Sequence, residues 1–414
     1  ERRLSLTGTP FRSDTSPIPF ITYEADAAGV RRSRADYTYS YGDALRDGVV
    51  RPVMFLAYSG QMRWRTRAGD EVSAQLGEPL TKDMIGQAWR TALAPEGEWI
   101  PAVLKAADTR LSQVRRTVPD AGGLVIATDQ TVARAYAAQL RAITGQPPVV
   151  VLSDDDDASS RIEEFDQGNQ RWMVAVRMVS EGVDVPRLAV GVYATATATP
   201  LYFAQAIGRF VRARRRGETA SIFLPSVPVL LGLAGELEIE RDHALDRPSR
   251  EEGIDGMLDD GLLAAANREE KASDDLDGPG FQALGAQASF DHVLLDGGQF
   301  GTGGDIGGEV ESDFLAIPGL METDEMASAL RARQASHVRS GHGRAGGLSP
   351  EATGSDVVDH RELTRLRKEL NQLVSAWARR ASTPHGVVHS RRRRHSGGPA
   401  VPLAKAELLR SRSA

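Results

Sequence analysis

The chain has 414 residues, a formal net charge of −6 and no cysteine. The lack of cysteine excludes disulfide frameworks and cysteine-bound zinc sites. No apolar run reaches the ~18 residues of a membrane-spanning helix, and no basic stretch followed by an apolar core marks a signal peptide. We therefore expect a cytoplasmic protein without a membrane partner and with roughly two or three domains.

Residues 1–58 predict an incomplete α/β unit. Its expected elements, in chain order, are a strand at 4–6, a strand at 37–41, a helix at 41–47 and a strand at 51–56. These elements are too few to close an independent parallel sheet. Residues 59–115 predict a helix around Thr109, and we interpret this stretch as a linker or insertion.

Residues 116–235 alternate short apolar runs with helical stretches. The expected strands are 123–127, 148–152, 171–178, 188–193 and 219–224, and the expected helices are 131–143, 158–165 and 200–214. Strands separated by helices indicate a parallel sheet with crossover helices on its faces. The apolar runs are nearly continuous, as strands buried on both faces require. We therefore expect one complete α/β domain, with functional residues at the carboxyl ends of its strands.

The remaining residues give weaker signals. Residues 236–350 are rich in Gly and in acidic residues, which favours a flexible linker. Residues 351–414 predict a small helical module with a basic tail. Its helix at 360–380 carries an apolar stripe that suits a core or a partner face, formed by Leu363, Leu366, Leu370, Leu373 and Trp377. The arginines at 391–394 could hold DNA phosphates or form a solvated tail, and His385 and His389 lack a third metal ligand.

Residues 205–212 carry the clearest chemical pattern. On a helix, four residues of this segment share one face, namely Gln205, Gly208, Arg209 and Arg212. Gly208 leaves room for the close approach of another surface, and two guanidinium groups one turn apart suit the oxygens of a polyphosphate. An arginine so placed can stabilise the charge on a transferred phosphoryl group. A solvated basic helix face is the alternative.

Two further segments combine a strand with a turn. Residues 179–186 follow a predicted buried strand and contain Gly182, which permits a tight turn, and Asp184, which can cap a turn or accept a hydroxyl proton. An ordinary exit from a strand explains this segment equally well. Residues 6–12 begin at the end of the expected strand at 4–6 and contain the turn Thr7-Gly-Thr-Pro10.

Together the three segments resemble motifs III, V and VI of superfamily 2 helicases, in the expected order, and residues 123–128 fall where motif IV belongs. The resemblance covers residues 1–235 and is greatest to the DEAD/DEAH-type branch that includes type III restriction translocases and DNA repair helicases. It implies an α/β fold: a RecA-like C-terminal helicase lobe at 116–235, with the tail of a first lobe at 1–58.

The resemblance also implies roles for individual residues. It places three at the catalytic site, namely Gln205 and the arginine fingers Arg209 and Arg212. It assigns contact with the nucleotide to Gly182, Asp184 and Gly208. It assigns nucleic-acid contact, or coupling of that contact to hydrolysis, to Thr7, Thr9, Thr128 and Ser180.

The sequence departs from this family in two ways. It has no Gly-x-x-x-x-Gly-Lys-Ser/Thr loop for the phosphates and no Asp-Glu-x-Asp or Asp-Glu-x-His segment for magnesium. Both belong upstream of motif III, so truncation explains their absence, and ATP and Mg²⁺ would be bound mainly by the missing lobe. Val176-Arg177 stands where DEAD-box proteins often carry Thr-Asp. This difference argues against an RNA helicase of the narrow DEAD-box type.

We therefore expect a fragment of an ATP-dependent helicase or translocase that acts on nucleic acid, DNA by preference, and that is inactive on its own. The alternative is a helicase-like module that binds nucleic acid or a partner without catalysis. A subunit of a restriction translocase is a further possibility, although no nuclease motif supports it.

Overall fold

A computed structural model describes residues 21–25, 31–39, 41–66, 71–152, 157–176, 185–235, 282–295, 298–301, 303–339, 357–359, 370, 373, 374 and 377. Among these residues, no helix combines the length and the apolar character that crossing a bilayer requires. The expected strand at 4–6, most of the expected helix at 360–380 and the whole basic tail lie outside the described residues.

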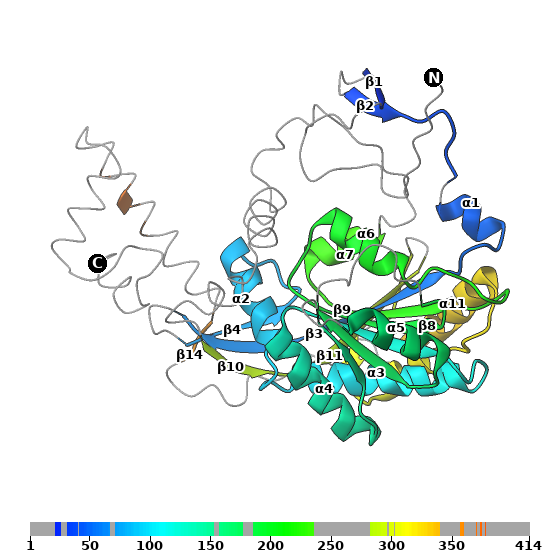
Figure 1. Ribbon diagram of the computed structural model, residues 1–414. Coiled ribbons are helices and arrows are strands. Elements are labelled where there is room, and N and C mark those ends of the chain that lie inside the picture. The colour runs from blue at the N-terminus through cyan, green and yellow to red at the C-terminus, as the bar shows by residue number, and fades with distance from the viewer. Residues whose placement is uncertain are drawn as a thin grey trace.

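The core is one large mixed sheet, in which six neighbouring strands are parallel (Figure 1). Their spatial order is β3 (Val53–Arg65), β9 (Ala220–Pro225), β8 (Leu188–Ala194), β5 (Gly122–Ala127), β7 (Trp172–Val176) and β6 (Val149–Val151). Every residue of β5, β7, β8 and β9 is buried. Their continuous apolar runs are thus explained by helices that cover both faces of the sheet.

Crossover helices supply that cover. α3 (Trp99–Arg115) and α4 (Gln130–Thr144) pack on one face, and α6 (Pro200–Gly208) and α7 (Pro228–Gly235) lie over the other (Figure 1). α5 (Ala158–Gln167) packs beside β6. The predicted α/β domain with a parallel sheet and flanking helices is confirmed for this part of the chain.

The first half of the chain joins this sheet more closely than we expected. β3 crosses the expected domain boundary at residue 58 and pairs in parallel with β9, from Val53↔Ala220 to Tyr58↔Pro225. Its second half pairs instead with β4 (Glu71–Leu76) and β10 (Gln282–Ala286), and α2 (Lys82–Leu93) covers these strands. Residues 59–115 are therefore part of the core and not a linker.

Residues 282–339 also differ from the expected flexible linker. β11 (Ser289–Leu295) adds to β3 in antiparallel register, and β12 (Gly298–Phe300) and β13 (Gly304–Asp305) pair with β11. α10 (Glu309–Leu315) and α11 (Thr323–Arg339) follow. The glycines here form tight turns, since Gly301, Gly303 and Gly307 have positive φ. Residues 236–281 lie outside the described residues.

Buried polar contacts fasten this segment to the sheet. The Tyr58 hydroxyl donates a hydrogen bond of 2.6 Å to Glu311 Oε1, and the Gly307 amide donates one of 2.5 Å to Oε2. Arg110 of α3, fully buried, donates to the backbone oxygens of Leu315 (3.2 Å) and Ile317. The segment is thus an integral layer of the domain.

The first two described strands do not belong to the large sheet. β1 (Thr22–Ala25) and β2 (Arg31–Arg34) form a separate two-stranded sheet, and α1 (Tyr41–Arg46) leads into β3. No strand is present at 37–39, the described part of the expected strand at 37–41. At the other end of the chain, β14 (Val357–Asp359) pairs with β4. Leu370 of the expected apolar stripe is buried, whereas Leu373 and Trp377 are partly exposed.

Candidate functional site

The topology singles out β5 as the point where the chain changes direction across the sheet. The crossover after β5 leads to β6 and β7 on one side, and the chain then returns to β8 and β9 on the other side. Ala127, the last residue of β5, is level with both Val176 of β7 and Ala194 of β8. In open α/β sheets, ligands bind outside the carboxyl ends of strands at such a switch point. We call this end of the six parallel strands the carboxyl edge.

Thr128 lies on the carboxyl edge, directly after β5, and is half-buried. The next residue, Asp129, caps α4 by accepting a hydrogen bond of 2.9 Å from the Val132 amide. Residues 177–184 begin directly after β7, whose end lies beside Thr128. The structure therefore places Thr128 directly after Ala127, which pairs with Val176, the last described residue before the segment with Ser180, Gly182 and Asp184. These three residues, like Thr7 and Thr9, lie outside the described residues.

A threonine-rich loop completes the carboxyl edge at β8. Thr195, Thr197 and Thr199 follow this strand at alternate positions. The Tyr193 hydroxyl holds the loop by donating to the Thr197 carbonyl at 2.6 Å, and the hydroxyl oxygens of Thr195 and Thr197 lie 3.3 Å apart. Sequence reasoning overlooked this loop, although hydroxyl residues after a predicted buried strand are a visible signal for the carboxyl edge.

α6 starts from this loop and ends sooner than predicted. Thr199 is its N-cap and accepts from the Tyr202 amide at 3.3 Å, with Pro200 in the first turn. Gln205 and Gly208 are exposed, and a Cβ on Gly208 would meet no atom within 4 Å. The helix ends at Gly208 instead of reaching residue 214. Gln205, Gly208 and Arg209 keep their common face, but Arg212 does not belong to the helix.

Tertiary contacts with the segment before β3 explain this early end. The Arg51 amide donates to the Val211 carbonyl at 2.7 Å, and Val50 forms an antiparallel bridge with Arg212. The Arg51 Nε atom also donates to the Phe210 carbonyl at 2.7 Å. These partners take the backbone groups that a longer helix would use, so the chain leaves the helix after Arg209.

Arg209 and Arg212 consequently lie near the end of the sheet at which the parallel strands begin, which we call the amino edge. Arg209 is half-buried, and burial lowers the pKa of its guanidinium. Arg212 is exposed. The predicted site residues are therefore divided, because Thr128 lies on the carboxyl edge and Arg212 at the amino edge.

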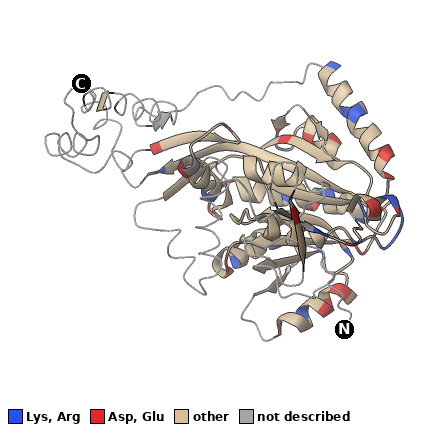
Figure 2. Ribbon diagram, turned by 90° about the horizontal axis from the view of Figure 1, so that it is seen from above, with Lys and Arg blue, Asp and Glu red and all other residues tan. Residues whose placement is uncertain are grey.

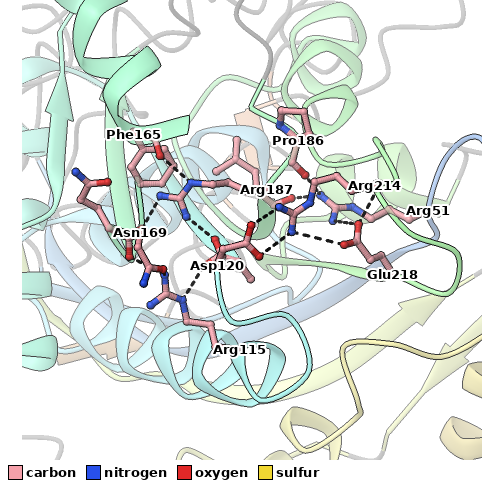
Figure 3. Close-up of polar contacts among 12 residues, drawn as sticks. Arg51, Arg115, Asp120, Phe165, Asn169, Pro186, Arg187, Arg214 and Glu218 are labelled. Carbon is pink, nitrogen blue, oxygen red and sulfur yellow. Dashed lines mark hydrogen bonds and ion pairs between the residues drawn. The ribbon is translucent and has the colours of Figure 1, made fainter. Parts of the chain in front are cut away.

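A network of arginines secures the amino edge (Figure 3). Arg51 and Glu218 form an ion pair of 3.3 Å, and both side chains are only 2% exposed. The Arg51 guanidinium also donates to the Leu188 carbonyl at the start of β8. Glu218 accepts from the Arg214 amide at 2.9 Å, and the Arg214 side chain reaches Asp120 at 2.5 Å. The starts of β3, β8, β9 and β5 are thus tied together.

Arg187 extends the network toward β7. Its guanidinium donates to the carbonyls of Asp120 (2.6 Å), Phe165 (2.7 Å) and Gln170 (2.7 Å), and lies 3.9 Å from the centroid of the Phe165 ring. Burial lowers its pKa to about 10, so it remains charged at neutral pH. Because backbone carbonyls satisfy this side chain, its role is structural.

Basic residues gather in the loop between α6 and β9, and Figure 2 colours Lys and Arg residues of the ribbon blue. Arg212, Arg214, Arg215 and Arg216 lie in this loop. Arg216 pairs with Glu322 at 3.0 Å on the surface, and Arg214 pairs with Asp120. The described residues contain no group of three or more acidic or histidine side chains arranged to hold a metal ion.

The sheet, its crossover helices and the switch point at β5 define an α/β protein with a mostly parallel sheet and flanking helices. The chain is 55% identical over 412 residues to the uncharacterized protein Rv2917 of Mycobacterium tuberculosis, and the match covers 99% of this chain and 68% of that protein. It is 51% identical over 413 residues to the uncharacterized protein ML1624 of Mycobacterium leprae, again covering 99% and 68%. The chain belongs to the family of these mycobacterial proteins.

No model of a known protein family matches the sequence. Among solved structures, one similar chain is a fragment of a putative HsdR subunit of a type I restriction enzyme from Vibrio vulnificus. It is 18% identical in sequence and has a TM-score of 0.34, and the match covers 49% of this chain and 37% of that chain. Domain 2 of the DEAD-box helicase Mss116p, bound to an RNA duplex, is 15% identical and has a TM-score of 0.28. That match covers 42% of this chain and 68% of that chain. The E. coli DEAD-box protein SrmB is 20% identical and has a TM-score of 0.26, and the match covers 33% of this chain and 83% of that chain.

Proposed function

We propose that this chain supplies the second motor lobe of an ATP-dependent helicase or translocase, with DNA as the preferred nucleic acid. The observation that carries the proposal is the placement of Arg209 at the end of α6, between an exposed Gly208 and the amino edge. A half-buried guanidinium at a helix end is suited to reach across a domain boundary to a phosphate.

The carboxyl edge supports the second half of the proposal. Thr128 and the loop with Thr195 and Thr197 directly follow β5 and β8, and β7 pairs in parallel with β5 up to Val176. Hydroxyl groups and backbone amides are common donors to nucleic-acid phosphates. We assign nucleic-acid contact to this edge, with Ser180 as a contributor, and coupling to the nucleotide to Gly182 and Asp184.

ATP and Mg²⁺ would be held mainly by a lobe that this sequence does not contain. Two residues of this chain suit the part of that task that requires positive charge beside the phosphates. The guanidinium groups of Arg209 and Arg212 lie near the amino edge, and a Cβ on the neighbouring Gly208 would meet no atom within 4 Å. Bound ATP would supply the free energy for movement along the strand. Gln205, exposed on α6 one turn before Arg209, would sense the state of the nucleotide.

The experiment measures DNA-stimulated ATP hydrolysis by the protein extended upstream to a complete first lobe. Arginine fingers contribute about 10³–10⁵ to kcat, so we expect Arg209→Ala to lower kcat by roughly 10³-fold and the present chain alone to be inactive. Arg331→Ala is the matched control, because Arg331 is an exposed arginine on α11. Full turnover by the Arg209→Ala protein would refute the assignment.

The sequence also lacks a phosphate-binding loop, and this favours a second candidate, a module that binds nucleic acid or a partner without catalysis. The same assay separates the two functions. An extended protein that binds DNA but hydrolyses no ATP would support the binding module.

A further inference from the structure

Arg110 of α3 is a fully buried arginine whose hydrogen-bond acceptors are all uncharged. Its Nε atom donates to the Ser221 hydroxyl at 2.9 Å, and its Nη1 atom donates to the carbonyls of Leu315 (3.2 Å) and Ile317. Its Nη2 atom is buried and meets no acceptor in the described part of the chain. A charged group buried in this way is ordinarily paired with an opposite charge.

Arg333 of α11 is a second arginine with an unsatisfied donor. The side chain is half-buried, but its Nη1 atom is buried and has no acceptor among the described residues. Arg333 precedes His337 by one helical turn, so the two share a face of α11. His337 packs on α10, because its ring centroid lies 6.1 Å from that of Phe314 and its Nε2 atom lies 3.0 Å from Asp313. Arg333 therefore lies on the face of α11 that packs on α10.

The two guanidinium groups converge at the C-terminal end of α10. Arg110 reaches the carbonyl of Leu315, the last residue of α10, and Arg333 lies on the helix face that contacts Phe314, one residue earlier. Burial and the positive charge of Arg333 lower the pKa of Arg110 to about 9. The two groups are thus within electrostatic range of each other, and Arg110 is still charged at pH 7.

The described carboxylates do not balance these two charges. Burial lowers the pKa of Arg333, and the charge of Asp313 opposes this shift. Asp313 is also the partner of His337, and its side chain is 50% exposed. Arg110 forms no ion pair with any residue that the structure describes. The two arginines therefore exceed the nearby carboxylate by one positive charge, and buried N–H donors without an acceptor are suited to bind an anion.

We propose that Arg110 Nη2 and Arg333 Nη1 together bind one small monovalent anion, of the size of chloride, at the C-terminal end of α10. The burial of Arg110 favours an ion of this size over a phosphate or a nucleotide. The half-buried side chain of Arg333 provides access from solvent. The bound ion holds residues 309–339 on the domain, because α11 and α3 share it. This anion site does not depend on the proposed function.

Urea unfolding of the 414-residue chain in mixtures of sodium chloride and sodium gluconate, at constant total salt, tests this site. Gluconate is too large for a buried pair of donors and serves as the non-binding anion. An anion that binds only the folded state lowers the unfolding constant by the factor 1 + [anion]/Kd. Above Kd, each tenfold rise in chloride should lower the unfolding constant about tenfold. The same unfolding constant in both salts would overturn the proposal.

Substitutions assign the chloride dependence to a side chain. Arg333→Met removes one donor at a half-buried position and keeps the apolar stem, so the chain should still fold. Its unfolding constant should not depend on chloride. Arg331→Met is the matched control, because Arg331 is an exposed arginine on the same helix, and this variant should keep the full dependence. A dependence that Arg333→Met retains, or that Arg331→Met also removes, would refute the assignment.

Bromide locates the ion directly, since it has the charge of chloride, a similar size and an anomalous X-ray signal. Crystals of the chain soaked in sodium bromide should show an anomalous peak in hydrogen-bonding contact with both Nη atoms. Peaks at other surface positions alone would indicate an adventitious ion only and would overturn the proposal, as would a water molecule between the two arginines. None of these measurements involves ATP or DNA, so failure of the proposed function would leave their outcome unchanged.

Discussion

The buried pair Arg51–Glu218 should be among the most sensitive polar contacts in this protein. Both side chains are 2% exposed, and burial lowers the pKa of Arg51 only to about 10, so Arg51 is charged at pH 7. Arg51→Met keeps an apolar stem but removes the guanidinium. Glu218 would then remain buried with only Arg214 as a partner, through its amide at 2.9 Å and its side chain at 3.5 Å.

Breaking a buried ion pair by removal of one partner destabilises a protein by about 3–5 kcal/mol. The carbonyls of Phe210 and Leu188 also lose their Arg51 donor, and a buried acceptor left unsatisfied costs about 1–3 kcal/mol. Because such terms are not additive, we expect Arg51→Met to lower the free energy of unfolding by at least about 3 kcal/mol. Arg51→Met with Glu218→Leu should cost at least about 1 kcal/mol less than the sum of the single changes.

Urea unfolding, followed by tryptophan fluorescence, measures these differences. The chain offers a matched control in Arg216 and Glu322, which form an ion pair of 3.0 Å with side chains 86% and 52% exposed. Exposed pairs contribute about 0–1 kcal/mol, so Arg216→Met should have little effect. If Arg51→Met destabilises the protein no more than Arg216→Met, the amino edge is not held by this network.

Two further changes test the sheet. Gly60 has a φ of +145°, and a Cβ there would lie 1.7 Å from the Gln287 carbonyl oxygen. Gly60→Ala should therefore lower the free energy of unfolding in urea by more than about 4 kcal/mol. Gly145 also has a positive φ, but a Cβ there would meet no atom within 4 Å, so Gly145→Ala should lower it by about 1–2 kcal/mol. Equal effects of the two substitutions would contradict the clash at Gly60. Hydrogen bonds from Arg214 lower the pKa of Asp120 below 3.8, so its contribution to stability is present above pH ~4 and is lost as the pH falls through the lowered pKa. The stability difference between wild type and Asp120→Asn, less than about 1 kcal/mol, should vanish in urea titrations at low pH; a constant difference would refute the pairing.

Four strands of the parallel sheet, β5, β7, β8 and β9, were predictable because each is an almost continuous apolar run that is buried on both faces. The helix at 130–144 was equally predictable, since Asp129 caps its start and Gly145 ends it with a φ of +72°. Local pattern and tertiary packing agree at these positions. The same agreement explains why Thr128, which follows a predicted strand, lies on the carboxyl edge as expected.

The errors arose where a distant partner decided the local structure. Arg51 donates to Phe210 across 159 residues of sequence and ends α6 early, and no pattern within 200–214 shows this. The glycines at 301–307 suggested a flexible linker, but their positive φ values form turns between strands that complete the sheet beside β3. Composition alone does not distinguish a turn-rich antiparallel segment from a linker.

The division of the site residues between two edges changes how the resemblance to helicases should be interpreted. β8 has seven residues, so the carboxyl and amino edges lie roughly 20 Å apart at about 3.3 Å per residue. One phosphate group cannot contact both Thr128 and Arg212 across that distance. If the proposed function holds, the two edges serve different ligands: the carboxyl edge faces nucleic acid, and the amino edge faces the nucleotide. The network of Arg51, Glu218 and Arg214 then connects the two edges mechanically, because it ties the loop with Arg212 to the starts of the strands whose ends carry Thr128 and Thr195.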